Sequence, residues 1–350
     1  MSLVATLAQN YRVAAPNFDK FEFRITEAGA FNAFQQQTMG NASFVTPELE
    51  QRAMMSMGRS LKIPAINYKD VTIRTTRPIT ISADENTSAF YTVTWATYAC
   101  GFLMYPAQHF NNDISYQMDF NKKFEAILVK MKAALDVAAV TALDTAKTQV
   151  IGSVVGGHTF ASNVLSEVVT DRRDSYILQD LKPTFRSNDY EPYMLDVVGN
   201  PGFESFMRRM EGFGTFNQED KTLQYAGNRF GFSNNIANAS GKHGTGYAIA
   251  DGSLGLLTRV EPDAILRTQL GTSHEWDVIE MPGLGINVGT YTYDAVVDAS
   301  SVASGATDHL TRTGAQAFDF AVDVAFVVAY NSDRSTIPGP IVKFNIEKSA

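Results

Sequence analysis

The chain has 350 residues, of which 45% are hydrophobic, 11% aromatic and only 19% charged. This length predicts one large domain or two to three small ones, and the apolar content excludes a disordered polymer. With 29 basic and 37 acidic residues, a net charge of −8, the composition argues against a dedicated nucleic-acid clamp. The charged fraction lies below the ~25% of ordinary soluble domains. It indicates that part of the surface is covered by something else, such as copies of the chain.

Cysteine usage and the apolar stretches bear on the cellular compartment. Cys100 is the single cysteine, so no intrachain disulfide can form, and we expect a small buried side chain there. Residues 1–6 lack the basic region and apolar run of a secretory signal. Phe318–Tyr330 is the most apolar late stretch, but it is far shorter than the ~20 residues that span a bilayer. The sequence therefore predicts folding in a reducing cytosol and no membrane partner.

The first 60 residues are rich in aromatic side chains but show no long period. Two interpretations stay open, a loop-rich subdomain or an arm that buries its aromatic residues against another chain. A short helix is expected over Thr46–Met57, with Thr46 as N-cap and Pro47 at the first helical position. The aromatic candidates for contact between subunits are Phe18, Phe21 and Phe23.

Residues 71–98 are predicted to form two long strands joined by a polar, acidic tip. Apolar and polar residues alternate in Val71–Ile81, and β-branched and aromatic residues fill Phe90–Tyr98. Because a two-stranded hairpin alone is marginal in water, one this long must lie on its own core or on a neighbouring subunit. Its charged candidates for contact between subunits are Arg74, Arg77, Asp84 and Glu85.

The strongest periodic signal lies in residues 113–149, where apolar residues recur at spacings of three and four. This pattern predicts one amphipathic helix. Asn112 or Asp113 can cap its start, and Asp119 with Lys123 forms a favourable i,i+4 pair. At ~1.5 Å per residue the helix would be about 55 Å long, which favours a spine across a flat domain or a coiled coil. The apolar stripe consists of Phe120, Phe124, Ile127, Leu128, Met131, Leu135, Ala138, Ala142, Leu143 and Ala146.

From residue 171 onward the pattern mixes helices and strands. A helix is expected over Asp174–Leu181, closed by Pro183, and a second over Phe203–Glu211. Residues 212–246 are rich in Gly and Asn, and residues 296–314 indicate a polar loop. The expected strands are Tyr193–Val198, Gly246–Ala250, Leu254–Arg259, Trp276–Glu280, Ala317–Tyr330 and Ile341–Ile346.

Motifs for catalysis or metal binding are weak. The five histidines lack the spacing of a zincin or a zinc finger. Asp251–Gly255 comes nearest to a nucleophile elbow, but Asp replaces the first Gly and a strand-like run follows, so a surface turn is the better interpretation. We therefore expect no catalytic residue, cofactor or metal. The chain contains two basic doublets, Arg172–Arg173 and Arg208–Arg209. Their side chains are expected either to lie on solvated helix faces or to form ion pairs with other subunits.

Charge is distributed unevenly along the chain. Residues 1–80 hold nine basic and six acidic residues, a net of +3. The other 270 residues therefore carry −11, the difference between the total of −8 and +3. This split suits a segment that reaches onto a neighbouring body, because complementary potentials aid docking and register.

The order of these parts resembles the major capsid proteins of tailed bacteriophages of the Hong Kong 97 type. An arm comes first, followed by a long hairpin, a very long helix and an α+β body. The body contains a strand–helix step at Val197–Phe203, the Gly246–Ser253 segment and a terminal strand. The resemblance covers nearly the whole chain and is architectural. It implies an α+β capsid fold with an N-terminal arm at 1–60, an E-loop hairpin at 61–100, a P-domain at 101–170 and 311–350 with a spine helix at about 111–150, and an A-domain at 171–310.

The resemblance implies a non-enzymatic protein that assembles in the host cytoplasm into the icosahedral shell of a virion around dsDNA. The implied partners are other copies of the chain in hexamers and pentamers, portal, scaffolding and decoration proteins, and non-specifically contacted DNA. Shell expansion would use hinges, for which Gly101 and Gly152 are candidates. The alternatives are an encapsulin-type nanocompartment shell of the same fold, an α+β hydrolase centred on Ser253, and a β-rich adhesin or tail protein.

Overall fold

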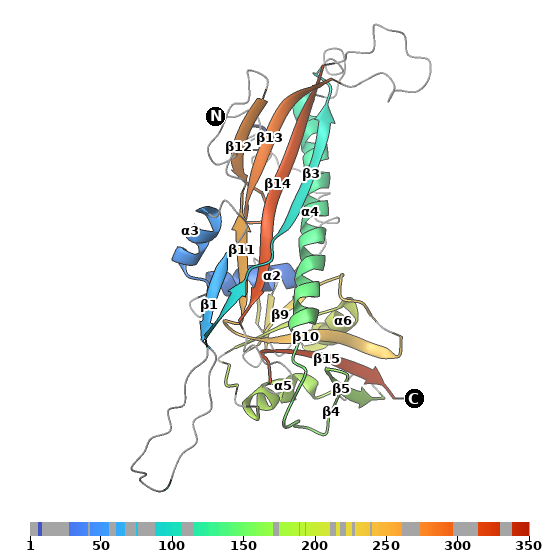
Figure 1. Cartoon of the computed structure of the whole chain (residues 1–350). Helices are drawn as coiled ribbons and strands as arrows, with labels where there is room; N and C mark the ends of the chain where they lie inside the picture. The colour runs from blue at the N-terminus through green and yellow to red at the C-terminus, as the bar shows by residue number, and fades with distance from the viewer. Residues whose placement is uncertain are drawn as a thin grey trace.

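Two β-sheets and one long helix organise the chain in the computed structural model (Figure 1). The sheets have eight and five strands, and a separate two-stranded hairpin lies beside them. None of the helices in the described part of the chain combines the length and hydrophobicity of a membrane span. The described residues are 6–8, 28–40, 43–55, 61–66, 75, 88–106, 115–170, 175–188, 190–192, 194–210, 215–217, 222–225, 228–238, 240–260, 274–296, 314–329 and 338–349.

The long helix α4 spans Tyr116–Ala146, so its 31 residues extend about 46 Å. The Ser115 hydroxyl caps it by accepting a hydrogen bond from the Met118 N–H at 3.2 Å. This replaces the predicted caps Asn112 and Asp113, which lie outside the described residues. Eight of the ten residues of the predicted stripe are buried, whereas Ala138 and Ala142 are partly buried and Ala139 is buried instead. The prediction of one uninterrupted spine helix is thereby confirmed.

The five-stranded sheet lies along one side of α4 (Figure 1). Its strands are β3 (Ala96–Met104), β11 (Leu254–Arg259), β12 (His274–Glu280), β13 (Asn287–Val296) and β14 (Gly314–Val328). The central strand β14 pairs antiparallel with β3 along one edge, and with β13 and then β11 along the other. The strand β13 was missed from the sequence, although Tyr291 and Tyr293 alternate there with Thr290 and Thr292.

The eight-stranded sheet lies across the end of α4 in the order β4-β5-β15-β10-β6-β9-β8-β7. Helices α5 (Ile177–Arg186) and α6 (Pro201–Met210) pack against its apolar residues. Pro183 lies inside α5, so the predicted end of that helix was wrong. Its strands are β4 (Thr159–Ala161), β5 (Val164–Val169), β6 (Leu195–Gly199), β7 (Thr215–Asn217), β8 (Thr222–Tyr225), β9 (Asn228–Phe232), β10 (Lys242–Ala250) and β15 (Ile341–Lys348).

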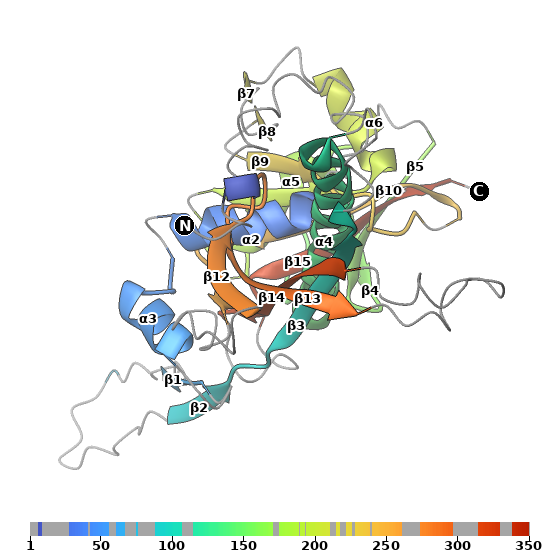
Figure 2. The same cartoon turned by 90° about the horizontal axis from the view of Figure 1, so that it is seen from above.

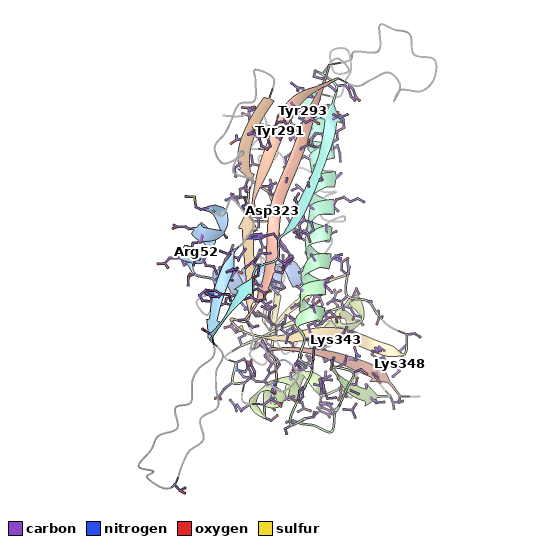
Figure 3. The ribbon with its side chains drawn as sticks, viewed as in Figure 1. Arg52, Tyr291, Tyr293, Asp323, Lys343 and Lys348 are labelled. Carbon is purple, nitrogen blue, oxygen red and sulfur yellow. The ribbon has the colours of Figure 1, made fainter. Side chains whose placement is uncertain are left out.

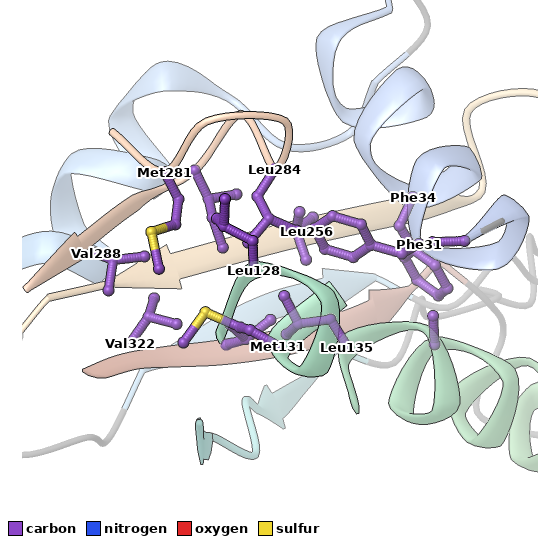
Figure 4. Packing of buried hydrophobic residues seen from close by; sticks show 14 of the residues in the cluster. Phe31, Phe34, Leu128, Met131, Leu135, Leu256, Met281, Leu284, Val288 and Val322 are labelled. Atoms are coloured by element: carbon purple, nitrogen blue, oxygen red, sulfur yellow. The ribbon is translucent and has the colours of Figure 1, made fainter. Parts of the chain in front are cut away.

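A single large core joins the two sheets through α4 and α2 (Gly29–Met39). Figure 4 shows Leu128, Met131 and Leu135 of α4 facing Leu256 of β11 and Val322 of β14. Seen from above, α2 and α4 lie next to each other at the centre of the molecule (Figure 2). Because this core takes residues from both sheets, the described body is one packed unit.

The helix α2 belongs to this body and not to an outlying arm. Phe31 and Phe34 have no exposed surface and pack edge-on against Phe326. The arm over residues 1–60 stays a prediction. In residues 28–40 and 43–55, apolar side chains of α2 and α3 are buried within the same chain. The candidate contact residues Phe18, Phe21 and Phe23 lie outside the described residues.

The predicted domain boundaries do not coincide with the sheets. Residues 171–310 contribute β6–β10 to the eight-stranded sheet but β11–β13 to the five-stranded sheet. The terminal strand β15 lies in the eight-stranded sheet, although residues 311–350 were assigned with the spine helix. The physical reason is long-range pairing, since β15 pairs with β10 and with the parallel strand β5.

Candidate assembly surfaces

The hairpin of β1 (Lys62–Ile66) and β2 (Ser88–Thr92) belongs to neither large sheet. Its two strands pair antiparallel, from Lys62 opposite Thr92 to Ile66 opposite Ser88. After β2 the chain continues into the five-stranded sheet, where β3 begins at Ala96. The predicted strand over 90–98 is thus divided between two sheets, because Val93 buries its side chain in a small core between them.

This small core attaches the hairpin to the body. It contains Leu49 and Ala53 of α3 (Pro47–Met55) together with Leu257 of β11 and Ala325 and Val327 of β14. The helix α3 begins as predicted, with the Thr46 hydroxyl accepting a hydrogen bond from the Leu49 N–H at 3.3 Å. Figure 2 shows α3 and the hairpin on one side of the molecule and α6 on the opposite side.

The hairpin presents one exposed aromatic side chain. Tyr91 and Ile63, which pair across its strands, pack against the small core. Phe90, the neighbouring residue on β2, points to the opposite face, because successive side chains of a strand alternate. Its side chain is 72% exposed. The Phe90 ring is therefore accessible to another molecule.

The face of the five-stranded sheet that points away from α4 is called here the outer face. On β14 the side chains of Phe318, Phe320 and Val322 enter the core, so Ala317, Asp319 and Ala321 lie on the outer face. The pairing register sets three rows across four strands. The rows are Val278–Gly289–Ala321–Ala99, Trp276–Tyr291–Asp319–Gly101 and His274–Tyr293–Ala317–Leu103.

An aromatic ladder stands at one side of the outer face (Figure 3). The rings of Trp276 and Tyr291 stack with centroids 4.4 Å apart, and Tyr291 and Tyr293 stack at 4.9 Å. All three side chains are partly exposed, as is Leu103 across the sheet. In the described part of the chain, the α3 helix and the root of the hairpin cover the other end of this face, near Ala325 and Val327. The three rows therefore form a partly exposed apolar patch.

Asp319 places a carboxylate in the middle of this patch. Tyr291 lies directly opposite it on β13 and Gly101 on β3. A Cβ atom on Gly101 would come within 1.9 Å of Asp319 Oδ1 and 2.8 Å of the Phe318 carbonyl oxygen. The Asp319 side chain could turn away but the backbone oxygen could not, so the strand favours glycine here. The Asp319 side chain is exposed, but the surrounding residues remove part of the water around its carboxyl group, and this partial desolvation raises its pKa. Within the described part of the chain, the carboxylate makes no hydrogen bond or ion pair.

A groove of about 790 Å³ continues from the outer face toward α3. Val278 of the outer face lines it together with Val260, Met54 and Met55. Met55 is 84% exposed, and Arg52 lies on the same helix (Figure 3). Among the described residues, this groove extends the partly exposed surface from Val278 to α3, and polar residues such as Arg52 and Asn287 line it too.

Two buried polar groups lock the sheets to α2. Gln37 donates a hydrogen bond to Asp196 Oδ2 at 2.6 Å and accepts the N–H groups of Ser253 and Leu254. Asp196 also forms a bidentate ion pair with Arg229, at 2.6 and 2.9 Å. Burial outweighs these hydrogen bonds and raises the pKa of Asp196. These contacts fix the body on which the assembly surfaces stand.

Asp144 connects the end of α4 to the eight-stranded sheet. Its Oδ1 accepts hydrogen bonds from Lys343 at 2.7 Å, Tyr247 at 2.8 Å and Lys147 at 3.0 Å. Burial opposes its charged form, but these hydrogen bonds outweigh burial and lower the pKa of Asp144 to about 2. Lys343 is labelled at this junction in Figure 3.

We expect Asp144→Asn to lower the free energy of unfolding by about 1 kcal/mol at pH 7, a modest value because the carboxylate is partly exposed. The folded-state pKa lies below the ordinary value, so the carboxylate stabilises the fold above about pH 4. This contribution is lost as the pH falls toward 2. Urea titrations of both proteins at several pH values test this, and a difference that grows on acidification would contradict it.

The predicted contact residues fall mostly outside the described part. Arg74, Arg77, Asp84, Glu85, Arg172 and Arg173 have no described position, and the side chains of Arg208 and Arg209 in α6 are likewise not described. Gly101 lies inside β3, paired with β14. Gly152 follows α4 and donates its N–H to Asn188 Oδ1 at 2.6 Å. The roles of all these residues stay predictions.

The turn residues Asp251 and Gly252 are partly exposed, whereas Ser253 itself is buried. The Ser253 hydroxyl donates to the Ala250 carbonyl at 2.6 Å. In the ranges that the structure describes, no three His, Cys, Asp or Glu side chains are grouped to hold a metal ion. Sequence reasoning did not connect the outer-face residues Trp276, Tyr291 and Asp319, because their shared face depends on strand register.

Comparison with solved structures places this fold among those of phage proteins. No protein-family model and no curated protein matches the sequence. A chain from Mycobacterium phage Che8 matches with a TM-score of 0.50 and 12% identity, covering 87% of this chain and 89% of that one. At this identity the likeness is one of fold. The predicted α+β architecture with a long helix is confirmed as a fold that a phage protein shares.

Two further similar structures also come from phages. The capsid asymmetric unit of cyanophage Pam1 has a TM-score of 0.47 and 13% identity, covering 86% of this chain and 87% of that chain. The capsid of Ralstonia phage GP4 has a TM-score of 0.47 and 8% identity, covering 84% and 85%.

Proposed function

We propose that this chain is a major capsid protein of the Hong Kong 97 type, which self-assembles into the icosahedral shell of a tailed phage. The observation that carries the proposal is the fold shared with the Che8 chain over most of both lengths. The order of hairpin, spine helix and α+β body supports it. A structural role in a shell also accounts for the low charged fraction of 19%, because much surface would face other copies.

The uncovered surfaces support the same proposal. A shell subunit needs heterologous contacts, in which one surface binds a different surface of the next copy. Repeating such a contact forms closed rings of five or six subunits. The exposed Phe90 on the hairpin and the apolar patch of the outer face are two different surfaces of this kind. The body between them is rigid, since α4 and α2 join both sheets in one core.

The finer parts of the proposal follow from the resemblance. Assembly would take place in the host cytoplasm, with portal, scaffolding and decoration proteins as partners and non-specific contact with packaged dsDNA. Gly101 and Gly152 would act as hinges on expansion. The eight-stranded sheet with α5 and α6 would form most of the A-domain, and the five-stranded sheet with α4 most of the P-domain.

The test is the assembly state of the purified protein and of a hairpin variant. The wild-type chain is expected to elute as rings or particles of megadalton size that are visible by electron microscopy. A short turn joining Ile66 to Ser88 removes residues 67–87, and these two residues already pair across the hairpin. We expect this variant to remain a folded monomer, because β1 and β2 keep their contacts with the small core.

Two outcomes would contradict the proposal. One is a wild-type chain that stays a 38.4 kDa monomer at high concentration, even with crowding agents or a scaffold. The other is normal particle formation by the variant that lacks residues 67–87, which would remove the hairpin from assembly. Thermal unfolding of both proteins is the control for folding.

A further inference from the structure

We propose that a pocket between α5 and the start of β9 binds a phosphate group, held by Lys182, Arg186 and Asn228. The pocket has a volume of about 490 Å³. It lies on the face of the eight-stranded sheet that points away from α4 (Figure 1). The inference goes beyond the proposed function, because phosphate binding is a property of the purified chain whether or not it assembles.

Strand alternation places Asn228 on the same face of the sheet as α5. Phe230, two residues farther along β9, belongs to one apolar cluster with Leu178 and Leu181 of α5. Because side chains two residues apart on a strand share a face, Asn228 also points toward α5. The pocket forms beside this cluster, where Leu178 and Pro183 give it an apolar side and polar side chains complete its lining.

Three side chains that can donate hydrogen bonds form a stripe along α5. Gln179, Lys182 and Arg186 are spaced by three and four residues, so they lie on one face of the helix, and all three line the pocket. Two like charges one turn apart destabilise a helix. The helix dipole favours a cation at Arg186, but its effect falls off within the last turn, before Lys182. A bound anion would offset the repulsion between the two cations.

Asn228 contributes a buried amide to the pocket. The residue is only 1% exposed, and its Oδ1 makes no hydrogen bond within the described residues. A buried polar atom without a partner costs stability and is rare in folded proteins, where a bound water or ion often accounts for it. Because no hydrogen bond holds this oxygen, the amide can turn its NH₂ group toward a bound oxyanion. An unsatisfied amide in a cationic pocket thus points to a ligand.

Carboxylates leave the pocket with a positive character. The described residues that line it include two cations and no carboxylate. Glu191 accepts a hydrogen bond from Arg186 at 2.8 Å, but both side chains are largely exposed, so water weakens this pair. The guanidinium has further N–H groups for a phosphate oxygen. Asp180 of α5 is instead paired with His158, 3.0 Å from its Nε2 atom.

The arrangement of the donors favours a phosphate group. Lysine binds phosphate as a point charge, and arginine binds it with a planar fork of N–H groups. A phosphate presents oxygens in several directions, so it can accept hydrogen bonds from α5 and from Asn228 of β9 together. The same group occurs as free phosphate and in the backbone of a nucleic acid. The experiment below distinguishes these two sources.

Titration with inorganic phosphate tests the pocket. Isothermal titration calorimetry follows binding to the purified chain at constant ionic strength, with chloride as the balancing anion. We expect one phosphate per chain, and an affinity that Lys182→Gln and Arg186→Gln each lower about tenfold, because each removes a charged hydrogen bond. Thermal unfolding of both variants is the control for folding. The matched control Lys122→Gln removes an exposed cation of α4 and should leave the affinity unchanged.

Hydrogen–deuterium exchange locates the bound phosphate without any substitution. Phosphate should slow exchange in peptides that cover α5 and the start of β9, and should leave peptides from α4 unchanged. This measurement keeps the inference testable if a variant folds poorly. A short DNA duplex, followed by fluorescence anisotropy, identifies the source. Weaker duplex binding by Lys182→Gln and Arg186→Gln indicates a nucleic-acid backbone, whereas unchanged duplex binding together with weaker phosphate binding indicates free phosphate.

Three results would overturn the inference. The first is a wild-type chain that binds neither millimolar phosphate nor the duplex. The second is binding that Lys182→Gln and Arg186→Gln change no more than Lys122→Gln does. The third is slowed exchange that is confined to peptides outside α5 and β9. None of these results bears on particle formation by the wild-type chain, so the proposed function is tested separately.

Discussion

Removal of residues 1–45 is expected to leave a chain that no longer folds cooperatively. The deletion takes away α2, including the fully buried Phe31 and Phe34 and the hydrogen bonds of Gln37. Losing one buried phenylalanine side chain typically costs about 3–5 kcal/mol, and two approach the whole stability of about 5–15 kcal/mol. We expect insoluble protein, or soluble protein without a sharp thermal transition in near-ultraviolet circular dichroism.

The control is removal of residues 1–27 only. This variant keeps α2 and the bridge between Ala28 and Ser233, and it loses the buried Leu7 and Ala8. It should fold with reduced stability and allow the arm to be tested in assembly. A folded monomer after removal of residues 1–45 would instead support the arm predicted for residues 1–60.

Replacement of Asp136 by alanine is expected to lower the free energy of unfolding by about 3–5 kcal/mol. This carboxylate lies in the middle of α4 and is fully buried. Its Oδ1 accepts the N–H groups of Ala30 and Phe31, at the start of α2, both at 3.1 Å. Its Oδ2 accepts hydrogen bonds from Ser233 and from Asn235, the latter at 2.7 Å. A negative charge at a helix N-terminus is also favoured by the helix dipole.

Urea unfolding at constant pH measures this loss, and the denaturant dependence should stay unchanged. Asp136→Asn keeps one acceptor oxygen for α2 and should lose less than alanine. Asp119→Ala on the same helix is the matched control, because its pair with Lys123 is partly exposed and is worth about 0.3–0.5 kcal/mol. A loss below about 1 kcal/mol for Asp136→Ala would show that α2 does not depend on this carboxylate.

The local features of the fold could be predicted because they depend on neighbours in sequence. The period of α4, the cap of α3 at Thr46 and the strand over Leu254–Arg259 follow from spacing and from the residues at the ends. Asp136 escaped prediction because a carboxylate on the apolar side of a helix has no local signature. Its partners lie about 100 residues away on both sides.

The candidate site could be predicted only in part. The basic character of the hairpin segment is visible in the composition of residues 61–82. The outer face is not, since Trp276, Tyr291 and Asp319 come from three strands and share a row only through their pairing register. A shift of the register by one residue would turn the paired side chains to the opposite face.

By itself, the sequence determined the long spine helix, the α+β character, the lack of an intrachain disulfide and the contrast between a basic beginning and an acidic remainder. Only the tertiary structure decided that α2 is buried, that β3 and β15 belong to different sheets, and that Asp319 lies in one row with Trp276 and Tyr291. Periodicity and capping are local properties. Sheet membership and burial depend on contacts between residues up to more than 200 positions apart, such as β3 with β14.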